Sequence, residues 1–418
     1  MEYYHYNRLT GTDVLCFDNV ALGNGLPDRY NRNRMVERSV EDAENMKTFI
    51  VVGAGILGAA TAYQLAKAGA DVIIVDRTDK GQATDAAAGI ICPWLSQRRN
   101  QAWYQLAKGG ARFYPALIEA LEQEGESQTG YRRVGALSIH KDLQKLEDMV
   151  KRAEKRKEDA PEVGVITQLS PSEAKSLFPP LSEEYGAVHI SGAARVDGRA
   201  LRDALLRAAQ RHGATYLKGN AVLLQEETRV TGVHVGDDRI QADTVIVCAG
   251  AWADQLLAPL GVHFKVTYQK AQIIHLELPG ADTDSWPVVI PPTDQYMLAF
   301  ENGRIVIGAT HENDVDGFDT RLTAGGMHEV FNKAFETAPA IAHCTFVEAR
   351  VGFRPFTPGF LPVIGELPGW EGILVANGLG ASGLTMGPFI GYQLAKLALG
   401  KELDIELEHY KVAGALVP

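Results

Sequence analysis

The first residues whose types and spacing could do chemistry form a glycine-rich motif near residue 50. Residues 53–58 read Gly-Ala-Gly-Ile-Leu-Gly and match GxGxxG, which binds a dinucleotide pyrophosphate where it joins a strand to a helix. Gly53 permits the tight turn, Gly55 lets the backbone approach the phosphates, and Gly58 allows close helix–strand packing. The carboxylate of Asp76, at the end of the next apolar run, can accept hydrogen bonds from a ribose diol. These residues predict a dinucleotide, either FAD or NAD.

A second glycine-rich segment, residues 377–388, lies near the end of the chain between an expected strand and an expected helix. Gly378, Gly380 and Gly383 let backbone N–H groups approach a planar ring. The helix expected to start near Leu384 would direct its positive end at negative charge on such a ring. A plain strand–helix turn is the alternative.

Arg354 is a third residue with chemical potential, because it precedes Pro355 in an otherwise apolar stretch. A guanidinium group binds a carboxylate through two parallel hydrogen bonds. The carboxylate could belong to a substrate or to a structural salt bridge, and the residue types alone leave both open.

The glycine motif requires a βαβ unit around it. Residues 48–52 form a β-branched and aromatic run, residues 56–68 are typical of a helix that Gly69 ends, and residues 72–75 predict a second buried strand. The whole unit occupies about 30 residues, as expected of this motif.

Further helices are expected over residues 101–124, 142–158, 198–211 and 386–399, with a kink or break at Pro115. The strands that look linked to the nucleotide fall at the start, the middle and the end of the chain, separated by mixed, β-rich stretches. This order predicts an α/β and α+β fold, with a Rossmann-type nucleotide-binding domain and an inserted β-rich mixed domain; the family resemblance given below implies that these are the FAD-binding domain and the substrate domain. The expected boundaries are 46–130, 187–258 and 346–418 for the first domain, and 131–186 and 259–345 for the second.

The composition is that of an ordinary globular protein. The 418 residues are 46% hydrophobic and 22% charged, and a formal net charge of −11 disfavours a nucleic-acid partner. Four widely spaced cysteines form no CxxC pair, so we expect no metal site and a reducing compartment. No apolar run reaches the roughly 20 residues that span a bilayer. We expect a cytoplasmic protein, with docking at the inner membrane face as the alternative.

The first 45 residues are polar and rich in Asn, Asp and Arg, which is typical of a disordered extension. Met46 stands directly before the first expected strand and could be the natural start. We therefore expect a chain that begins at Met46 to retain its cofactor.

Segments spread from about Lys47 to Gly400 resemble the D-amino-acid oxidase family of flavoproteins, most of all its bacterial glycine oxidase and D-amino-acid dehydrogenase branch. Their order and spacing together make the resemblance specific. The segments are ATDAAAGIICP at 83–93, RVDGRALRDALLRAAQRHGA at 195–214, DTVIVCAGAW at 243–252, GFRPFTPGFLPVIG at 352–365 and NGLGASGLTMGP at 377–388.

The resemblance implies FAD as the cofactor and places the matched residues around it. The 83–93 loop would pass the pyrophosphate and reach the flavin, and the backbone at Val222 would contact adenine. The expected cofactor-binding residues are Gly53, Gly55, Ile56, Leu57, Gly58, Asp76, Arg77, Thr84, Gly89, Ile91, Val222, Gly250, Trp252, Gly378, Gly380, Ser382, Gly383, Leu384 and Thr385.

On the substrate side, the resemblance assigns Arg354 to holding a substrate carboxylate and Tyr296 to donating to the same carboxylate. A core position is the alternative for Tyr296. His311 follows an expected strand and lies either near the flavin ring or at the surface. Lys270 and Gln272 are expected to be mainly structural.

Two departures from the family pattern refine the expectation. Glycine oxidase and D-amino-acid oxidase place a second arginine in the last flavin loop, where this chain has Ala381. That favours the dehydrogenase-like branch. Cys344 does not stand in the context of the cysteine that links flavin covalently in sarcosine oxidase, so non-covalent FAD is expected.

The expected reaction is hydride transfer from the α carbon of a D-amino acid or glycine to FAD. The imino acid then hydrolyses to a keto acid and ammonia, and the electrons pass to oxygen, a quinone or another acceptor. Oxidative demethylation of an N-methyl amino acid such as sarcosine stays open. So do an NAD-dependent dehydrogenase and a non-catalytic flavin-binding protein. A homo-oligomer is compatible with all of them.

Overall fold

A six-stranded sheet holds the glycine motif at its centre. The computed structural model describes residues 46–417, so the expected extension over residues 1–45 lies outside the described part. The strand order is β19-β20-β13-β1-β2-β9, parallel except for β19, and the sheet therefore combines segments from the start, middle and end of the chain. Its strands are β1 (Thr48–Val52), β2 (Asp71–Asp76), β9 (Thr215–Lys218), β13 (Thr244–Val247), β19 (Val363–Glu366) and β20 (Ile373–Asn377).

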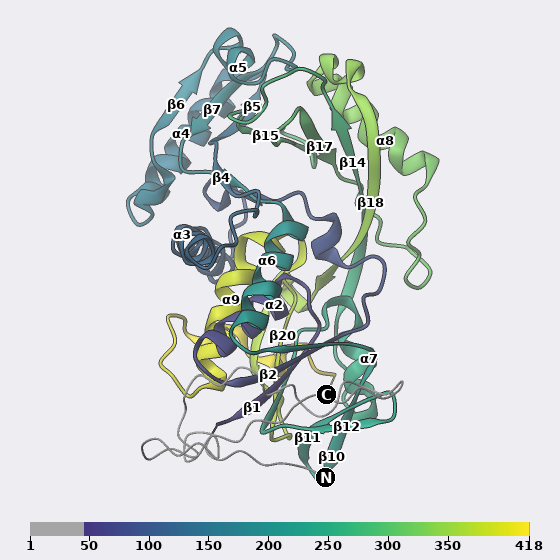
Figure 1. The fold of residues 1–418 in the computed structure, drawn as a ribbon. Helices are drawn as coiled ribbons and strands as arrows, with labels where there is room; N and C mark the ends of the chain where they lie inside the picture. The colour runs from purple at the N-terminus through teal and green to yellow at the C-terminus, as the bar shows by residue number, and fades with distance from the viewer. Residues whose placement is uncertain (1–45, 418) are drawn as a thin grey trace, which may run out of the picture. The chain divides into compact units, whose positions relative to one another are not determined.

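Helix α2 (Ile56–Lys67) follows the glycine motif and packs against α6 (Gly198–Arg211) and α9 (Gly383–Ala398). These helices lie together beside the six-stranded sheet in Figure 1. Helix α3 (Gln101–Gln123) packs on α9 and continues through Pro115, so of the kink or break expected there, the break is wrong.

The second large sheet has eight strands in the order β18-β14-β17-β16-β15-β5-β7-β6. Its longest strands, β14 and β18, pair antiparallel along their whole length and run towards the nucleotide-binding part of the chain (Figure 1). The strands are β5 (Ala136–His140), β6 (Ile166–Leu169), β7 (Gly186–Ile190), β14 (Thr267–Glu277), β15 (Val288–Ile290), β16 (Tyr296–Ala299), β17 (Arg304–Gly308) and β18 (Thr345–Phe356).

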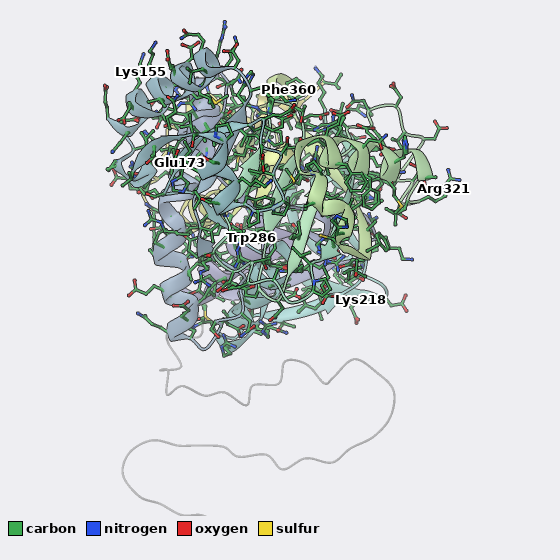
Figure 2. The ribbon with its side chains drawn as sticks, turned by 90° about the horizontal axis from the view of Figure 1, so that it is seen from above. Lys155, Glu173, Lys218, Trp286, Arg321 and Phe360 are labelled. Atoms are coloured by element: carbon green, nitrogen blue, oxygen red, sulfur yellow. The ribbon has the colours of Figure 1, made fainter. Side chains whose placement is uncertain are left out.

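Three helices cover this sheet: α4 (Leu143–Lys157), α5 (Pro171–Leu177) and α8 (Ala324–Thr337). The charged α4 buries only a narrow stripe that includes Leu146 and Met149. Figure 2 shows Lys155 at its outer edge, as a solvated face requires.

Two three-stranded sheets complete the strand pairing. The first, β3-β8-β4, joins the 83–93 loop to the rest of the chain, and the second, β10-β11-β12, follows β9. The elements are β3 (Ile90–Ile91), β4 (Arg132–Arg133), β8 (Ala194–Arg195), β10 (Ala221–Glu226), β11 (Arg229–Val235) and β12 (Asp238–Gln241), with the short helix α7 (Ala253–Leu257) after β13.

Parallel and antiparallel sheets therefore occur together, as the mixed fold class predicted. The domain boundaries stay a prediction. Strand β7 and strand β18 both belong to the eight-stranded sheet, while β19 after them belongs to the six-stranded one. Within residues 46–417, no helix is both long and apolar enough to cross a membrane.

Candidate active site

A cavity of about 580 Å³ collects residues from both large sheets. It extends from the β1–α2 turn, past the 83–93 loop, to the ends of β16 and β18. Most of the residues predicted from sequence line it: Gly53, Gly55, Ile56, Leu57, Asp76, Thr84, Gly89, Gly250, Trp252, Tyr296, Arg354, Gly380, Ser382, Gly383, Leu384 and Thr385.

Two further predicted residues, Arg77 and Val222, line a second hollow of about 220 Å³. Gly53, Asp76 and Trp252 border both hollows, so the second lies next to the first at the β2 end.

Three predicted residues line neither hollow. Gly58 is a packing residue, because a Cβ there would lie 1.8 Å from the carbonyl oxygen of Gly53. Ile91 is buried in the core, and Gly378 has a φ of +81° in the turn after β20. These residues shape the backbone that borders the cavity.

At the β2 end, Asp76 is buried and accepts three hydrogen bonds from the chain. The N–H of Ala54 donates to its Oδ2 at 2.6 Å, while the N–H of Thr78 and the Nε2 of Gln82 donate to Oδ1 at 2.5 and 2.9 Å. A carboxylate offers roughly four acceptor positions. One position on Oδ2 is therefore left for a ligand hydroxyl.

The helices that begin at the cavity share a feature. Among the α-helices of residues 46–417, α2, α7 and α9 begin without a side-chain cap, whereas the other five have one. The N-cap residues of the three uncapped helices, Gly55, Trp252 and Ser382, all line the cavity. At α2 the N–H of Ile56 already donates to the Oγ1 of Thr84 at 3.0 Å, and a ligand can supply acceptors for the other first-turn N–H groups.

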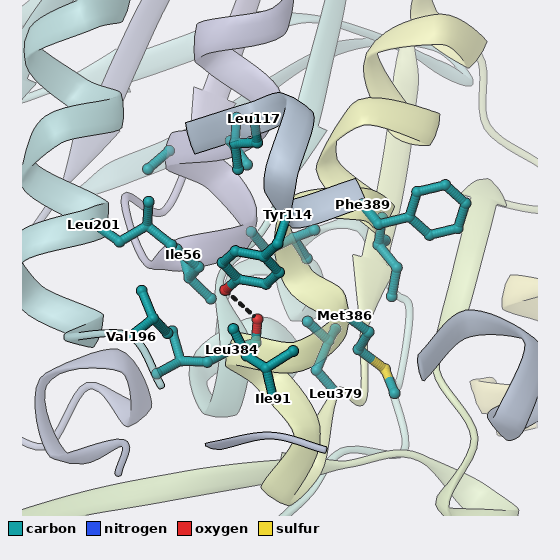
Figure 3. Packing of buried hydrophobic residues seen from close by; sticks show 14 of the residues in the cluster. Ile56, Ile91, Tyr114, Leu117, Val196, Leu201, Leu379, Leu384, Met386 and Phe389 are labelled. Carbon is teal, nitrogen blue, oxygen red and sulfur yellow. Dashed lines mark hydrogen bonds between the residues drawn. The ribbon is translucent and has the colours of Figure 1, made fainter. Parts of the chain in front are cut away.

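The start of α9 is held in place by α3. The hydroxyl of Tyr114 donates to the carbonyl oxygen of Leu384 at 2.6 Å, and Figure 3 shows this bond within a buried apolar cluster. Gly110 makes the approach possible, because a Cβ there would lie 2.1 Å from the carbonyl oxygen of Thr385. The glycine loop before α9 is thus fixed by residues more than 250 positions earlier.

Arg354 lies near the end of β18, half-buried and opposite Gln269 of β14. Its Nη1 donates to the Oε1 of Gln269 at 3.0 Å. No carboxylate in residues 46–417 forms a salt bridge with this guanidinium group, so the structural salt bridge left open by the sequence is absent from that part of the chain. Its charge faces the cavity without an anionic partner.

Tyr296 and His311 line the cavity beside Arg354. Burial raises the pKa of Tyr296, and the nearby charge of Arg354 offsets part of that rise, so the phenol stays protonated and able to donate. Burial, then the charge of Arg354, lowers the pKa of His311. Its Nδ1 lies 3.3 Å from the Oδ2 of Asp294, whose Oδ1 accepts a 2.9 Å hydrogen bond from the Nζ of Lys333.

Lys270 and Gln272 lie outside the cavity lining, in agreement with a structural role. Lys270 is buried, and its Nζ lies 3.8 Å from Glu312 and 3.6 Å from Asp319. Cys344 is also absent from the lining, but Cys92 is part of it. Burial raises the pKa of the Cys92 thiol to about 12, which keeps it protonated.

Sequence reasoning missed Arg98, which lines the same cavity. It lies between the 83–93 loop and α3, and its guanidinium carbon is 4.8 Å from the ring centre of Trp103. Ala381 lines the cavity at the place where the resemblance predicts a second arginine. The only available signal was the pair of adjacent arginines, Arg98 and Arg99, soon after a predicted flavin-contacting loop.

Comparisons with known proteins agree with this geometry. A family model described as FAD dependent oxidoreductase matches residues 48–397. An uncharacterized oxidoreductase of Bacillus subtilis, YurR, is 64% identical over 371 residues, which cover 89% of this chain and 100% of the relative. A glycine oxidase of Pseudomonas aeruginosa is 32% identical, covering 88% and 99%. The crystal structure of iminodiacetate oxidase from Chelativorans sp. BNC1 is 47% identical and superposes with a TM-score of 0.84, covering 87% and 98%.

Proposed function

Because this chain belongs to the FAD dependent oxidoreductase family, we propose that it oxidises the C–N bond of a small amino acid whose carboxylate binds Arg354. The observation that carries the proposal is that the guanidinium group of Arg354 lines the cavity without an acidic partner among residues 46–417. Family membership also decides the choice of cofactor in favour of FAD over NAD.

The described residues fit FAD. Gly55 lines the cavity, and a Cβ there would meet only the Oγ1 of Thr84, at 3.4 Å, so the missing side chain leaves space for a ligand. The uncapped N-termini of α2 and α9 offer N–H groups at two places along one cavity. We propose that the α2 end holds the pyrophosphate, Asp76 the ribose, and the α9 end the flavin. Bound FAD would supply the acceptor for the hydride of the substrate.

The protein residues align the substrate and set its charge. Arg354 can bind a carboxylate through two hydrogen bonds, and the protonated Tyr296 can donate a third. The cavity wall beside them includes Trp103 and Ile290, which limit water around the amine. Neutral His311 adds no charge that would repel a protonated amine. Orientation and desolvation are then the contribution of the protein.

The amine can be primary, as in a D-amino acid or glycine, or secondary, as in an N-substituted glycine. Similarity to an iminodiacetate oxidase at 47% identity favours the secondary amine as the second candidate. The primary amine would give a keto acid and ammonia, and the secondary amine an aldehyde or keto acid and a smaller amine.

The test is an anaerobic absorbance spectrum of the full chain, taken before and after adding glycine, sarcosine, iminodiacetate, proline and D- and L-amino acids. We expect the visible flavin bands to bleach with a small amino acid. Readmitting air would then separate an oxidase from a dehydrogenase by the rate of reoxidation. Flavin bands that none of these amines bleaches would contradict the proposed function.

The electron acceptor, a cytoplasmic location and an oligomeric state stay predictions. Oxygen and a quinone are the two acceptors to compare, in solution and with membrane vesicles. Sedimentation of the purified chain would give the oligomeric state.

A further inference from the structure

The cavity contains a second guanidinium group, that of Arg98, which the proposed function does not use. Arg98 lies in the segment that joins η2 (Pro93–Leu95) to α3, whereas Arg354 lies on β18. The two cations therefore reach the same cavity from separate elements.

Trp103 gives Arg98 a fixed neighbour. The guanidinium carbon of Arg98 lies 4.8 Å from the ring centre of this buried indole, which also lines the cavity. A guanidinium group over an aromatic face keeps its N–H edges available for a carboxylate. The position is thus partly ordered before any ligand binds.

Neither cation is neutralised by the described chain. No carboxylate in residues 46–417 pairs with Arg98 or with Arg354, and burial lowers the pKa of Arg98 with no acidic neighbour to oppose it. The acids in the lining are Asp76, at the opposite end, and Asp294, which is paired with Lys333. Within the described lining, neither guanidinium group therefore has an acidic partner.

A single α-carboxylate would use only one of these cations. The last flavin loop, residues 377–385, has no cationic side chain, so Arg98 is the second positive group available beside Arg354 in the described lining. Arg98 is exposed, so water solvates it in the free protein, and a carboxylate that enters the cavity would replace that water with a charged hydrogen-bond pair. A ligand with two carboxylates would neutralise both.

We propose that Arg98 is a specificity-determining residue that binds a second carboxylate, so that the preferred substrate is a small amine carrying two carboxylates. This inference rests on the proposed function and narrows its substrate class. The simplest such compound is iminodiacetate, a secondary amine between two acetate arms.

The reaction balances without a further reactant beyond water and the electron acceptor. One methylene C–H gives a hydride to FAD and the nitrogen loses a proton, which leaves a C=N bond. Water adds to that carbon and the C–N bond breaks, giving glyoxylate and glycine. Oxygen or a quinone then takes the two electrons.

The first test compares iminodiacetate with sarcosine, which has one carboxylate, as substrates of the wild type, Arg98→Gln and the control Arg99→Gln. Arg99 is the adjacent exposed arginine and does not line the cavity. We expect Arg98→Gln to lower kcat/KM for iminodiacetate about 10- to 150-fold, the effect of losing one charged hydrogen-bond pair. In Arg98→Gln, kcat/KM for sarcosine should change less than about threefold. Arg99→Gln should leave kcat/KM unchanged for both substrates.

The second test measures binding without turnover. Diglycolate, the ether analogue of iminodiacetate, and methoxyacetate, with one carboxylate, are titrated into the holoenzyme and followed by the shift of the flavin bands. We expect diglycolate to bind more tightly to the wild type, and the two Kd values to converge in Arg98→Gln.

The outcomes separate the two proposals. If kcat/KM in Arg98→Gln falls equally for iminodiacetate and sarcosine, or falls for neither, the role of Arg98 is overturned. Amine oxidation as the proposed function is not affected by that result. If no amine bleaches the flavin, the proposed function fails, and the diglycolate titration still decides whether Arg98 recognises a second carboxylate.

Discussion

Replacing Arg354 with alanine should weaken the binding of amino-acid substrates without removing FAD. In the described chain, the side chain of Arg354 is hydrogen-bonded to Gln269 and contacts Tyr296, and both are neutral partners. Its loss leaves no buried carboxylate unpaired, so the free energy of unfolding should fall by no more than about 1.5 kcal/mol. The larger effect falls on the substrate, which loses a charged pair of roughly 1.5–3 kcal/mol, or about 10- to 150-fold in KM.

The assay is steady-state turnover with an artificial electron acceptor, with flavin content read from the absorbance spectrum of each purified variant. Arg354→Lys keeps the charge but loses the two-pronged geometry, so its KM should fall between those of the wild type and Arg354→Ala. Arg229→Ala, which removes an exposed arginine paired with Glu371, serves as the distant control. A normal KM in Arg354→Ala, or a colourless protein, would refute the assignment of Arg354 to the substrate.

Three further predictions concern the cofactor site and acid stability. Gly58→Ala places a Cβ 1.8 Å from the carbonyl oxygen of Gly53, so it should lose FAD on purification and about 1–3 kcal/mol of unfolding free energy in urea; full FAD content would contradict the packing argument. Asp76→Asn should raise the Kd for FAD about tenfold or more in fluorescence titrations of the apoprotein, and an unchanged Kd would remove Asp76 from the ribose site. Burial, with the charge of Arg350, lowers the pKa of His275 from 6.5 to about 4. The unfolded chain then binds the proton first, so stability falls as pH drops from 6.5 to 4. Between pH 7 and pH 4, the free energy of unfolding in urea should fall by on the order of 3 kcal/mol less in His275→Leu than in the wild type.

The parts of the site predicted from sequence are those encoded by contiguous residues. The glycine motif sits between β1 and α2 as predicted, and Gly53 has a φ of +102° there, which other residues rarely adopt. Asp76 is the last residue of β2, because an apolar run ends at the sheet edge where the phosphate-binding turn also lies. In the β1–α2–β2 unit, the local sequence pattern is therefore enough to predict the local structure.

The parts that escaped prediction depend on distant contacts. Helix α3 continues through Pro115 because tertiary packing against α9 outweighs the loss of one hydrogen bond. The position of Arg98 in the cavity lining depends on the path of the irregular segment that joins η2 to α3. The adjacent Arg98 and Arg99 were the only local signal, and the family resemblance predicts the second arginine at the position that Ala381 occupies.

The central position of β1 has a consequence for how the protein is made. A ribosome releases β1 and β2 early, but β13 is paired with β1 across about 195 residues, and the bond between Tyr114 and Leu384 joins positions 270 apart. Chains with such distant contacts fold slowly and expose strand edges meanwhile. The cavity is complete only once α9 has left the ribosome, so a nascent chain that ends before residue 379 has the whole glycine motif but lacks one wall of the cavity.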